Sequence, residues 1–167
     1  MSGKLNEAKG KKNEALASYV KATEALPAPA KIKIYAEARL RMLTGLCLYA
    51  EGVEALSRFR QKQWLEPEAA QGWYRQLGDG LVGQGGNLAI DAYMAGVDEE
   101  MPKDSKAAQQ IHLQLGDLFR KAGEMEKGRG HLQKAQGGPD ELLKKKAKSL
   151  LSQIEIDLRR KPRRVVL

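Results

Sequence analysis

The tripeptide Leu-Gly-Asp occurs twice in this 167-residue chain, and each time a glycine follows six residues after the aspartate. The two copies read LGDGLVGQG at 77–85 and LGDLFRKAG at 115–123, so the offset is 38 residues (115 − 77). An internal period of roughly 20–50 residues is typical of proteins that stack one supersecondary unit several times. The recurrence therefore predicts an array of short structural repeats.

The composition favours helices as the repeated element. Ala, Leu, Lys, Glu, Gln and Arg dominate, and these residues have high helix propensity. Aromatic residues make up only 5%, and no stretch alternates apolar and polar residues as a half-buried strand does. We therefore expect an all-α protein. The single cysteine, Cys47, excludes an internal disulfide framework. No apolar run approaches the ~20 residues of a membrane span, and no signal peptide is visible, so the sequence assigns no compartment.

Small and large residues recur at helical spacing in both copies. In the second copy, one helix carries Leu115, Gly116 and Phe119, and Gly123 stands where a helix C-cap is expected. A second helix then carries Gly128, Leu132 and Ala135 at spacings of four and three. The first copy repeats this order with Tyr74, Leu77, Gly78, Leu81, Ala89, Tyr93 and Pro102.

This order of residues resembles the tetratricopeptide repeat, a helix–turn–helix unit of ~34 residues with the pattern W-x2-L-G-x2-Y…A-x3-F…P. The Trp position holds Tyr74 in one copy and His112 in the other. Two further second helices follow the pattern, with Ala15 and Ala55 as well as Pro27 and Pro67 lying 40 residues apart. The resemblance implies a right-handed superhelical solenoid of antiparallel helix pairs. The longer period predicts one long first helix over 31–50.

The predicted organisation is a repeat array over 1–139, a capping helix over 140–161 and a basic tail over 162–167. The array divides into a partial repeat at 1–30 and repeats at 31–67, 68–102 and 103–139. The first unit has only residues 2–9 ahead of Gly10 for its first helix. We therefore expect a chain cut from a longer array, or a second segment or chain that covers Leu16 and Tyr19, which leaves self-association through this repeat as an option. Asp140 is the predicted N-cap of the capping helix.

The sequence contains no phosphate-binding loop, zinc-protease motif or nucleophile elbow. Cys47 is expected as a buried apolar residue on the long helix. His112 is expected in the core and His131 on the surface, and two histidines without nearby acidic ligands predict no metal site. We therefore predict a protein that is not an enzyme and needs no cofactor.

The resemblance implies instead that the first helices line a concave groove that binds another protein or a peptide. Helix periodicity places Leu40, Cys47 and their neighbours on this face. The predicted groove residues are Thr44, Leu48, Arg75, Asp79, Val82, Leu113, Asp117, Arg120 and Lys121. The face mixes apolar and charged side chains, which suits a peptide of mixed character. The acidic Asp79 and Asp117 argue against the subtype that grips a terminal carboxylate. The predicted function is a protein–protein interaction scaffold.

An alternative function rests on charge. The net charge is +8, and residues 140–167 contribute +5 from nine basic and four acidic side chains. Such a footprint can contact nucleic acid, an anionic membrane or an acidic partner. The basic residues of this patch are Lys144, Lys145, Lys148, Arg159, Arg160, Arg163 and Arg164. Residues 140–167 contain no aromatic side chain for base stacking, so a solvated helix face is favoured over nucleic-acid binding.

Overall fold

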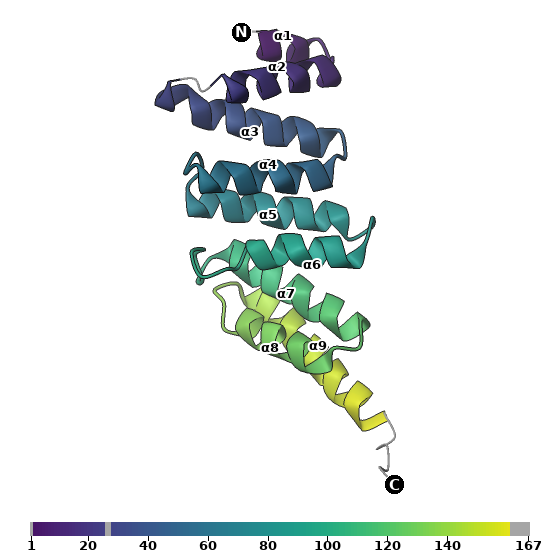
Figure 1. Cartoon of the computed structure of the whole chain (residues 1–167). Coiled ribbons are helices and arrows are strands. Elements are labelled where there is room, and N and C mark those ends of the chain that lie inside the picture. The colour runs from purple at the N-terminus through teal and green to yellow at the C-terminus, as the bar shows by residue number, and fades with distance from the viewer. Residues whose placement is uncertain (1, 26–27, 161–167) are drawn as a thin grey trace. The chain divides into compact units, whose positions relative to one another are not determined.

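The structure, a computed structural model, describes residues 2–25 and 28–160, and all regular secondary structure in these residues is helical (Figure 1). The prediction of an all-α protein is confirmed. The chain forms two compact units, residues 1–92 and 93–167, which are described separately. The first unit contains α1 (Ser2–Ala8), α2 (Lys12–Glu24), α3 (Pro29–Gly45), α4 (Tyr49–Gln61), α5 (Pro67–Leu81) and most of α6 (Gly86–Ala95). The second contains α7 (Lys106–Lys121), α8 (Met125–Gln136) and α9 (Glu141–Arg160).

The helix starts reveal the register of the repeat. α2, α4, α6 and α8 begin at residues 12, 49, 86 and 125, so successive starts lie 37, 37 and 39 residues apart. This corrects the 40-residue alignment of Ala15 with Ala55, because Gly52 is the residue that shares the position of Ala15 in its helix. The same position is buried in all four helices, where it holds Ala15, Gly52, Ala89 and Gly128. Four residues later, each helix buries Tyr19, Leu56, Tyr93 or Leu132.

The small residues at this position let neighbouring helices approach closely. A Cβ atom at Gly128 of α8 would lie 2.9 Å from the carbonyl oxygen of Gly116 in α7, which is closer than real Cβ contacts allow. In the first unit, a Cβ at Gly52 of α4 would lie 2.6 Å from a methyl carbon of Leu77 in α5. Glycine is therefore required at Gly128, where the neighbour is backbone, whereas at Gly52 the neighbour is a leucine side chain that could shift.

The long helix predicted over 31–50 is interrupted in the structure. α3 ends at Gly45, and the Leu48 amide donates a hydrogen bond to the Leu43 carbonyl at 2.9 Å across the turn. Glycine lowers helix propensity, and the left-handed Cys47 (φ 58°) ends the helical hydrogen-bond ladder. Apolar periodicity continues on both sides of this turn, which is why the pattern alone predicted one helix.

Two predictions for this segment are therefore wrong. Cys47 is exposed in the turn between α3 and α4 and is not buried on a helix. Leu40, expected on the groove face, is fully buried. Cys47 instead occupies a turn position that glycine holds before α2 and before α8. Gly10 lies 37 residues before Cys47 and Gly123 lies 76 residues after it, and both glycines have φ above 70°. The left-handed conformation recurs even where the residue is not glycine.

The first unit also differs from expectation at its start. Residues 2–8 form the helix α1, which packs against α2, so a helix does precede α2 in this repeat. Tyr19 is only 3% exposed and packs in a core cluster with Ala15, Ala38 and Met42, with Leu16 against its edge. Tyr19 is therefore covered largely by residues of its own unit.

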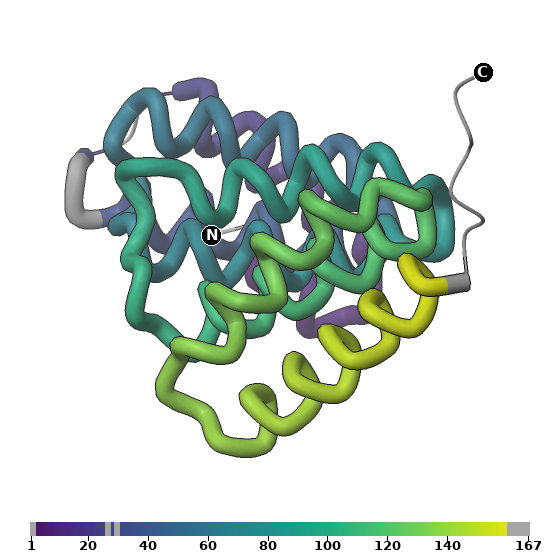
Figure 2. The backbone as a smooth tube through the Cα atoms, turned by 90° about the horizontal axis from the view of Figure 1, so that it is seen from below, coloured from purple at the N-terminus to yellow at the C-terminus, as the bar shows by residue number. Residues whose placement is uncertain are grey.

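In the second unit, α9 packs against both α7 and α8, and Figure 2 shows it in yellow beside their green coils. Asp140 caps α9 as predicted, because its Oδ1 accepts hydrogen bonds from the amides of Leu142 and Leu143 at 3.0 and 3.1 Å. The apolar side of α9 closes the core of this unit. The buried cluster consists of Leu132, Ala135, Ala147 and Ile154.

The strained turn makes a testable prediction. A non-glycine residue in the left-handed region costs about 1–2 kcal/mol, and the greater freedom of unfolded glycine offsets roughly half of this. Cys47→Gly should therefore raise the free energy of unfolding by about 0.5–1 kcal/mol, measured by urea denaturation. Cys47→Ser keeps the strain and should remain close to wild type. A glycine variant no more stable than the serine variant would contradict this assignment of strain.

Candidate functional site

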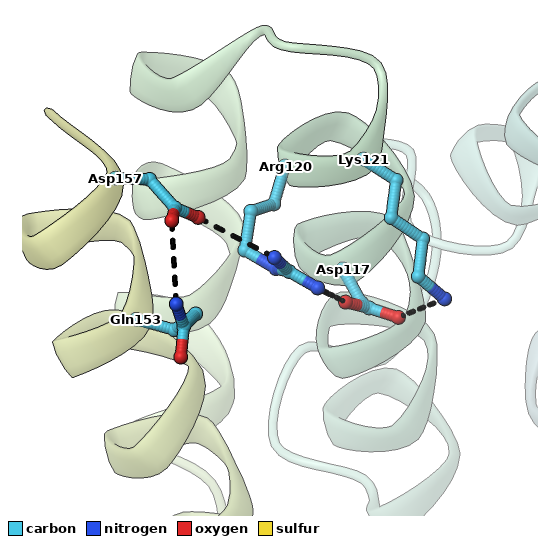
Figure 3. Close-up of polar contacts among 5 residues, drawn as sticks. All are labelled: Asp117, Arg120, Lys121, Gln153 and Asp157. Atoms are coloured by element: carbon cyan, nitrogen blue, oxygen red, sulfur yellow. Dashed lines mark hydrogen bonds and ion pairs between the residues drawn. The ribbon is translucent and has the colours of Figure 1, made fainter. Parts of the chain in front are cut away.

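Four predicted groove residues lie on α7, namely Leu113, Asp117, Arg120 and Lys121. Leu113, Asp117 and Arg120 lie on its side toward α9, whereas Lys121 extends away from α9 (Figure 3). A cavity of about 380 Å³ lies beside them, between the two helices. It is lined by Leu113, Gln114, Asp117, Lys146, Ser149 and Leu150. We call this cavity the α7–α9 groove. The last three residues come from α9, so the wall opposite the predicted face is formed by the predicted capping helix.

The floor of the α7–α9 groove is apolar and its edges are polar. Leu113 and Leu150 are half-buried and pack against the core cluster of the second unit. Gln114 and Ser149 are exposed and offer an amide and a hydroxyl to a bound group. The charged lining residues have opposite signs, with the Asp117 carboxylate on α7 and the exposed Lys146 ammonium on α9.

A network of charged side chains joins α7 to α9 next to this groove (Figure 3). Arg120 donates from Nη2 to Asp117 Oδ1 at 2.9 Å and from Nη1 to Asp157 Oδ2 at 3.5 Å. Lys121 Nζ lies 2.7 Å from the other Asp117 oxygen, and Gln153 Nε2 donates to Asp157 Oδ1 at 3.2 Å. The Arg120 guanidinium therefore links the two helices, and Asp117 is held by two cations.

The network fixes the protonation state of Asp117. Partial burial raises the pKa of this carboxyl. The hydrogen bonds from Lys121 and Arg120 and the charges of both side chains together lower it by more, so the pKa of Asp117 lies below its ordinary value. Asp117 is therefore ionised at neutral pH. Arg120 and Lys121 compensate its charge, and its carboxylate oxygens keep lone pairs that can accept hydrogen bonds from a ligand in the α7–α9 groove.

Gln109 anchors α9 at its other end. Its side chain is 2% exposed, and its Nε2 donates to the carbonyl oxygens of Ala135 at 2.8 Å and Asp140 at 3.0 Å. Its Oε1 accepts from the Asp140 amide at 2.8 Å. A buried amide that satisfies three backbone groups fixes the turn between α8 and α9 on α7. The two helices that line the groove are thus joined near both ends by polar contacts.

The predicted groove residues of the first unit lie on or beside α3, α4 and α5. Arg75 Nη1 and Asp79 Oδ2 are 2.6 Å apart, one turn apart on α5. Val82 is exposed directly after this helix. Thr44 donates its hydroxyl to the Leu40 carbonyl at 2.9 Å, and Leu48 is the half-buried residue that precedes α4. These side chains stay predicted groove residues.

His112 on α7 and His131 on α8 face each other, with Nδ1 atoms 3.0 Å apart, and His131 stacks on Phe119 at 5.5 Å between ring centroids. His131 is half-buried, which corrects its predicted surface position. Burial lowers the pKa of both rings, and His131 and Lys134 lower that of His112 further, to about 4. Neutral rings in different tautomers make one N–H···N hydrogen bond, so the contact is one between neutral histidines.

The basic residues of the alternative surface are distributed along α9. Lys145, Lys148 and Arg159 are exposed, whereas Lys144 is half-buried and pairs with Glu141 at 2.6 Å. The side chain of Arg160 and all of Arg163 and Arg164 lie outside the described residues.

Within residues 2–25 and 28–160, no group of three or more His, Cys, Asp or Glu side chains is arranged to hold a metal ion. In the same residues, no helix combines the length and apolarity needed to cross a bilayer. No protein-family model matches the chain, and neither a curated protein nor a solved structure shows significant similarity to it. The tetratricopeptide resemblance therefore stays a proposal, supported by the repeat register alone.

The histidine pair predicts a pH dependence of stability. The folded pKa of His112 is about 4, against an ordinary 6.5, so the unfolded chain binds more protons between these values. The contribution is fully present above pH 6.5 and is lost as the pH falls toward 4. Because the rings are partly exposed, we expect a loss of roughly 1 kcal/mol between pH 7 and pH 5, measured by urea denaturation at both values.

His112→Phe is the matched variant for this measurement, since it keeps an aromatic ring and removes the titrating group. Its free energy of unfolding should change less than that of wild type between pH 7 and pH 5. An equal change in the two proteins would show that the histidine pair does not cause the pH dependence.

Proposed function

We propose that this chain is a non-catalytic protein-interaction module, a tetratricopeptide-like solenoid that binds a peptide or protein segment. The observation that carries the proposal is the α7–α9 groove, where an apolar floor, two neutral polar groups and two opposite charges line one cavity. Peptide-binding grooves combine these elements, because apolar contacts supply affinity and a few polar groups fix orientation.

The repeat register supports the solenoid part of the proposal. Small residues recur where helices approach closely, and large buried residues follow four positions later in each second helix. A helix pair of this kind cannot bury its apolar side alone, and stacking of successive pairs completes the core. The short α1 and the long α9 stand at the two ends of the described helices.

The groove chemistry defines the proposed ligand. An apolar side chain on the bound segment fits against Leu113 and Leu150. A cationic or hydrogen-bond-donating group fits near Asp117, and an acidic group fits near Lys146. Gln114 and Ser149 can satisfy backbone groups of an extended peptide, which would otherwise lose their hydrogen bonds to water.

Site-specific photo-crosslinking tests this proposal in the native host. A photoreactive phenylalanine analogue at Ser149 lies in the α7–α9 groove, whereas the same analogue at Glu155 lies on α9 outside it. We expect the Ser149 probe to capture one defined protein segment, identified by mass spectrometry, and the Glu155 probe to leave it uncaptured. Equal capture from both positions, or none from Ser149, would count against the groove.

The captured segment then allows a charge test. Lys146→Glu reverses a charge in the groove, and Lys148→Glu makes the same change in net charge on an exposed residue that does not line it. We expect the first variant to weaken binding about tenfold, or ~1.4 kcal/mol, by fluorescence anisotropy, with little effect of the second. Equal weakening by both variants would favour binding by the overall basic surface of α9.

A further inference from the structure

A second cavity of about 340 Å³ lies in the first unit, among α1, α2 and α3. None of the predicted groove residues lines it. Its lining includes Lys4, Ser18, Tyr19, Lys31, Ile34 and Tyr35. We call it the N-terminal cavity.

α1 is held in place by contacts that form one wall of this cavity. Gly3 lies directly on the Tyr19 ring, where a Cβ atom would come within 2.8 Å of a ring carbon. The Tyr19 hydroxyl donates to Glu7 Oε2 at 2.9 Å, and Arg41 Nε donates to Glu7 Oε1 at 3.1 Å. Both oxygens of the Glu7 carboxylate are therefore engaged by groups of the first unit.

The apolar side of the N-terminal cavity is open to solvent. Ile34 is 50% exposed, although it lies on a helix that buries other apolar side chains. Tyr35 is half-buried, and its ring centroid lies 6.5 Å from that of Tyr19. An exposed isoleucine beside two tyrosine rings offers a binding surface for one apolar side chain.

The charged side chains in the lining have a single sign. Lys4 and Lys31 are both exposed, and neither has a carboxylate within ion-pair distance in the described residues. The lining contains no acidic residue. The Lys4 charge also acts on Glu7, which lies outside the lining and is already engaged by Tyr19 and Arg41. The cavity therefore combines an apolar wall with two exposed cations and no lining carboxylate, and this charge favours an anionic ligand.

We propose that the N-terminal cavity binds an acidic and apolar segment of another protein. One apolar side chain of the segment contacts Ile34 and Tyr35, and neighbouring Asp or Glu side chains contact Lys4 and Lys31. The cavity is at the small end of the range for small-molecule sites and is open, which suits a side chain presented by a longer chain. This proposal does not depend on the α7–α9 groove, because the two cavities share no lining residue.

Selection from a phage-displayed library of random dodecapeptides, with the full chain as bait, tests the proposal. We expect enrichment of peptides that carry Leu, Ile, Phe or Trp flanked by Asp or Glu. Their affinity, measured by fluorescence anisotropy, should fall at least tenfold for the double variant Lys4→Glu/Lys31→Glu. The double variant Lys9→Glu/Lys33→Glu changes two exposed lysines outside the cavity by the same charge and should bind within twofold of wild type.

Ile34→Ser is a further variant that leaves the net charge unchanged, and it should also weaken binding about tenfold. Several outcomes would overturn the proposal: no enrichment of acidic peptides, or equal loss of affinity in the two charge-reversed double variants. A concentration-dependent dimer that Lys4→Glu/Lys31→Glu abolishes would identify the occupant as a second copy of the chain and would overturn it as well.

Discussion

The close crossing of helix backbones at small residues is the contact on which the rest of the structure depends. Gly128 can lie against the Gly116 carbonyl only because neither residue has a side chain. This approach brings Leu132 onto Gly116, and Leu132 then forms the buried cluster that α9 covers. The same principle places Gly52 against Leu77 in the first unit. Glycines that have no side chain of their own thus determine how closely the neighbouring helices pack and how much apolar surface Leu132 and its neighbours bury.

The α7–α9 groove follows from how α9 is attached. Ile154 and Ala147 bury one side of the helix in the core, while Gln109 at one end and Arg120 at the other bind it to α7 through polar contacts. Buried or half-buried polar contacts of this kind specify position more than they add stability. The gap that remains between the two helices exposes Leu113 and Leu150 in part, and these side chains give the proposed groove its apolar floor.

The sequence predicted the helical class and the small and large positions over 115–135, because glycine and leucine there have strong and local preferences. It predicted one helix over 31–50 because apolar periodicity continues across the turn and does not reveal that Cys47 adopts a left-handed conformation. Asp117, Arg120 and Lys121 were predicted on one face, but their partner Asp157 lies 37 residues beyond Arg120 and no local pattern indicates it. Ser149 and the N-terminal cavity were missed for the same reason, and Lys146 was assigned to the basic face of its helix and not to the groove, since contacts between distant segments determine these sites.

The most direct test of the account compares two glycines of the same helix. A Cβ at Gly128 meets the backbone of α7, whereas a Cβ at Gly130 meets no atom within 4 Å. We expect Gly128→Ala to lower the free energy of unfolding by about 1–3 kcal/mol through overpacking. Gly130→Ala should raise it by roughly 0.5–1 kcal/mol through helix propensity. If both alanines stabilise the protein equally in urea denaturation, the close helix crossing does not exist and the account built on it is wrong.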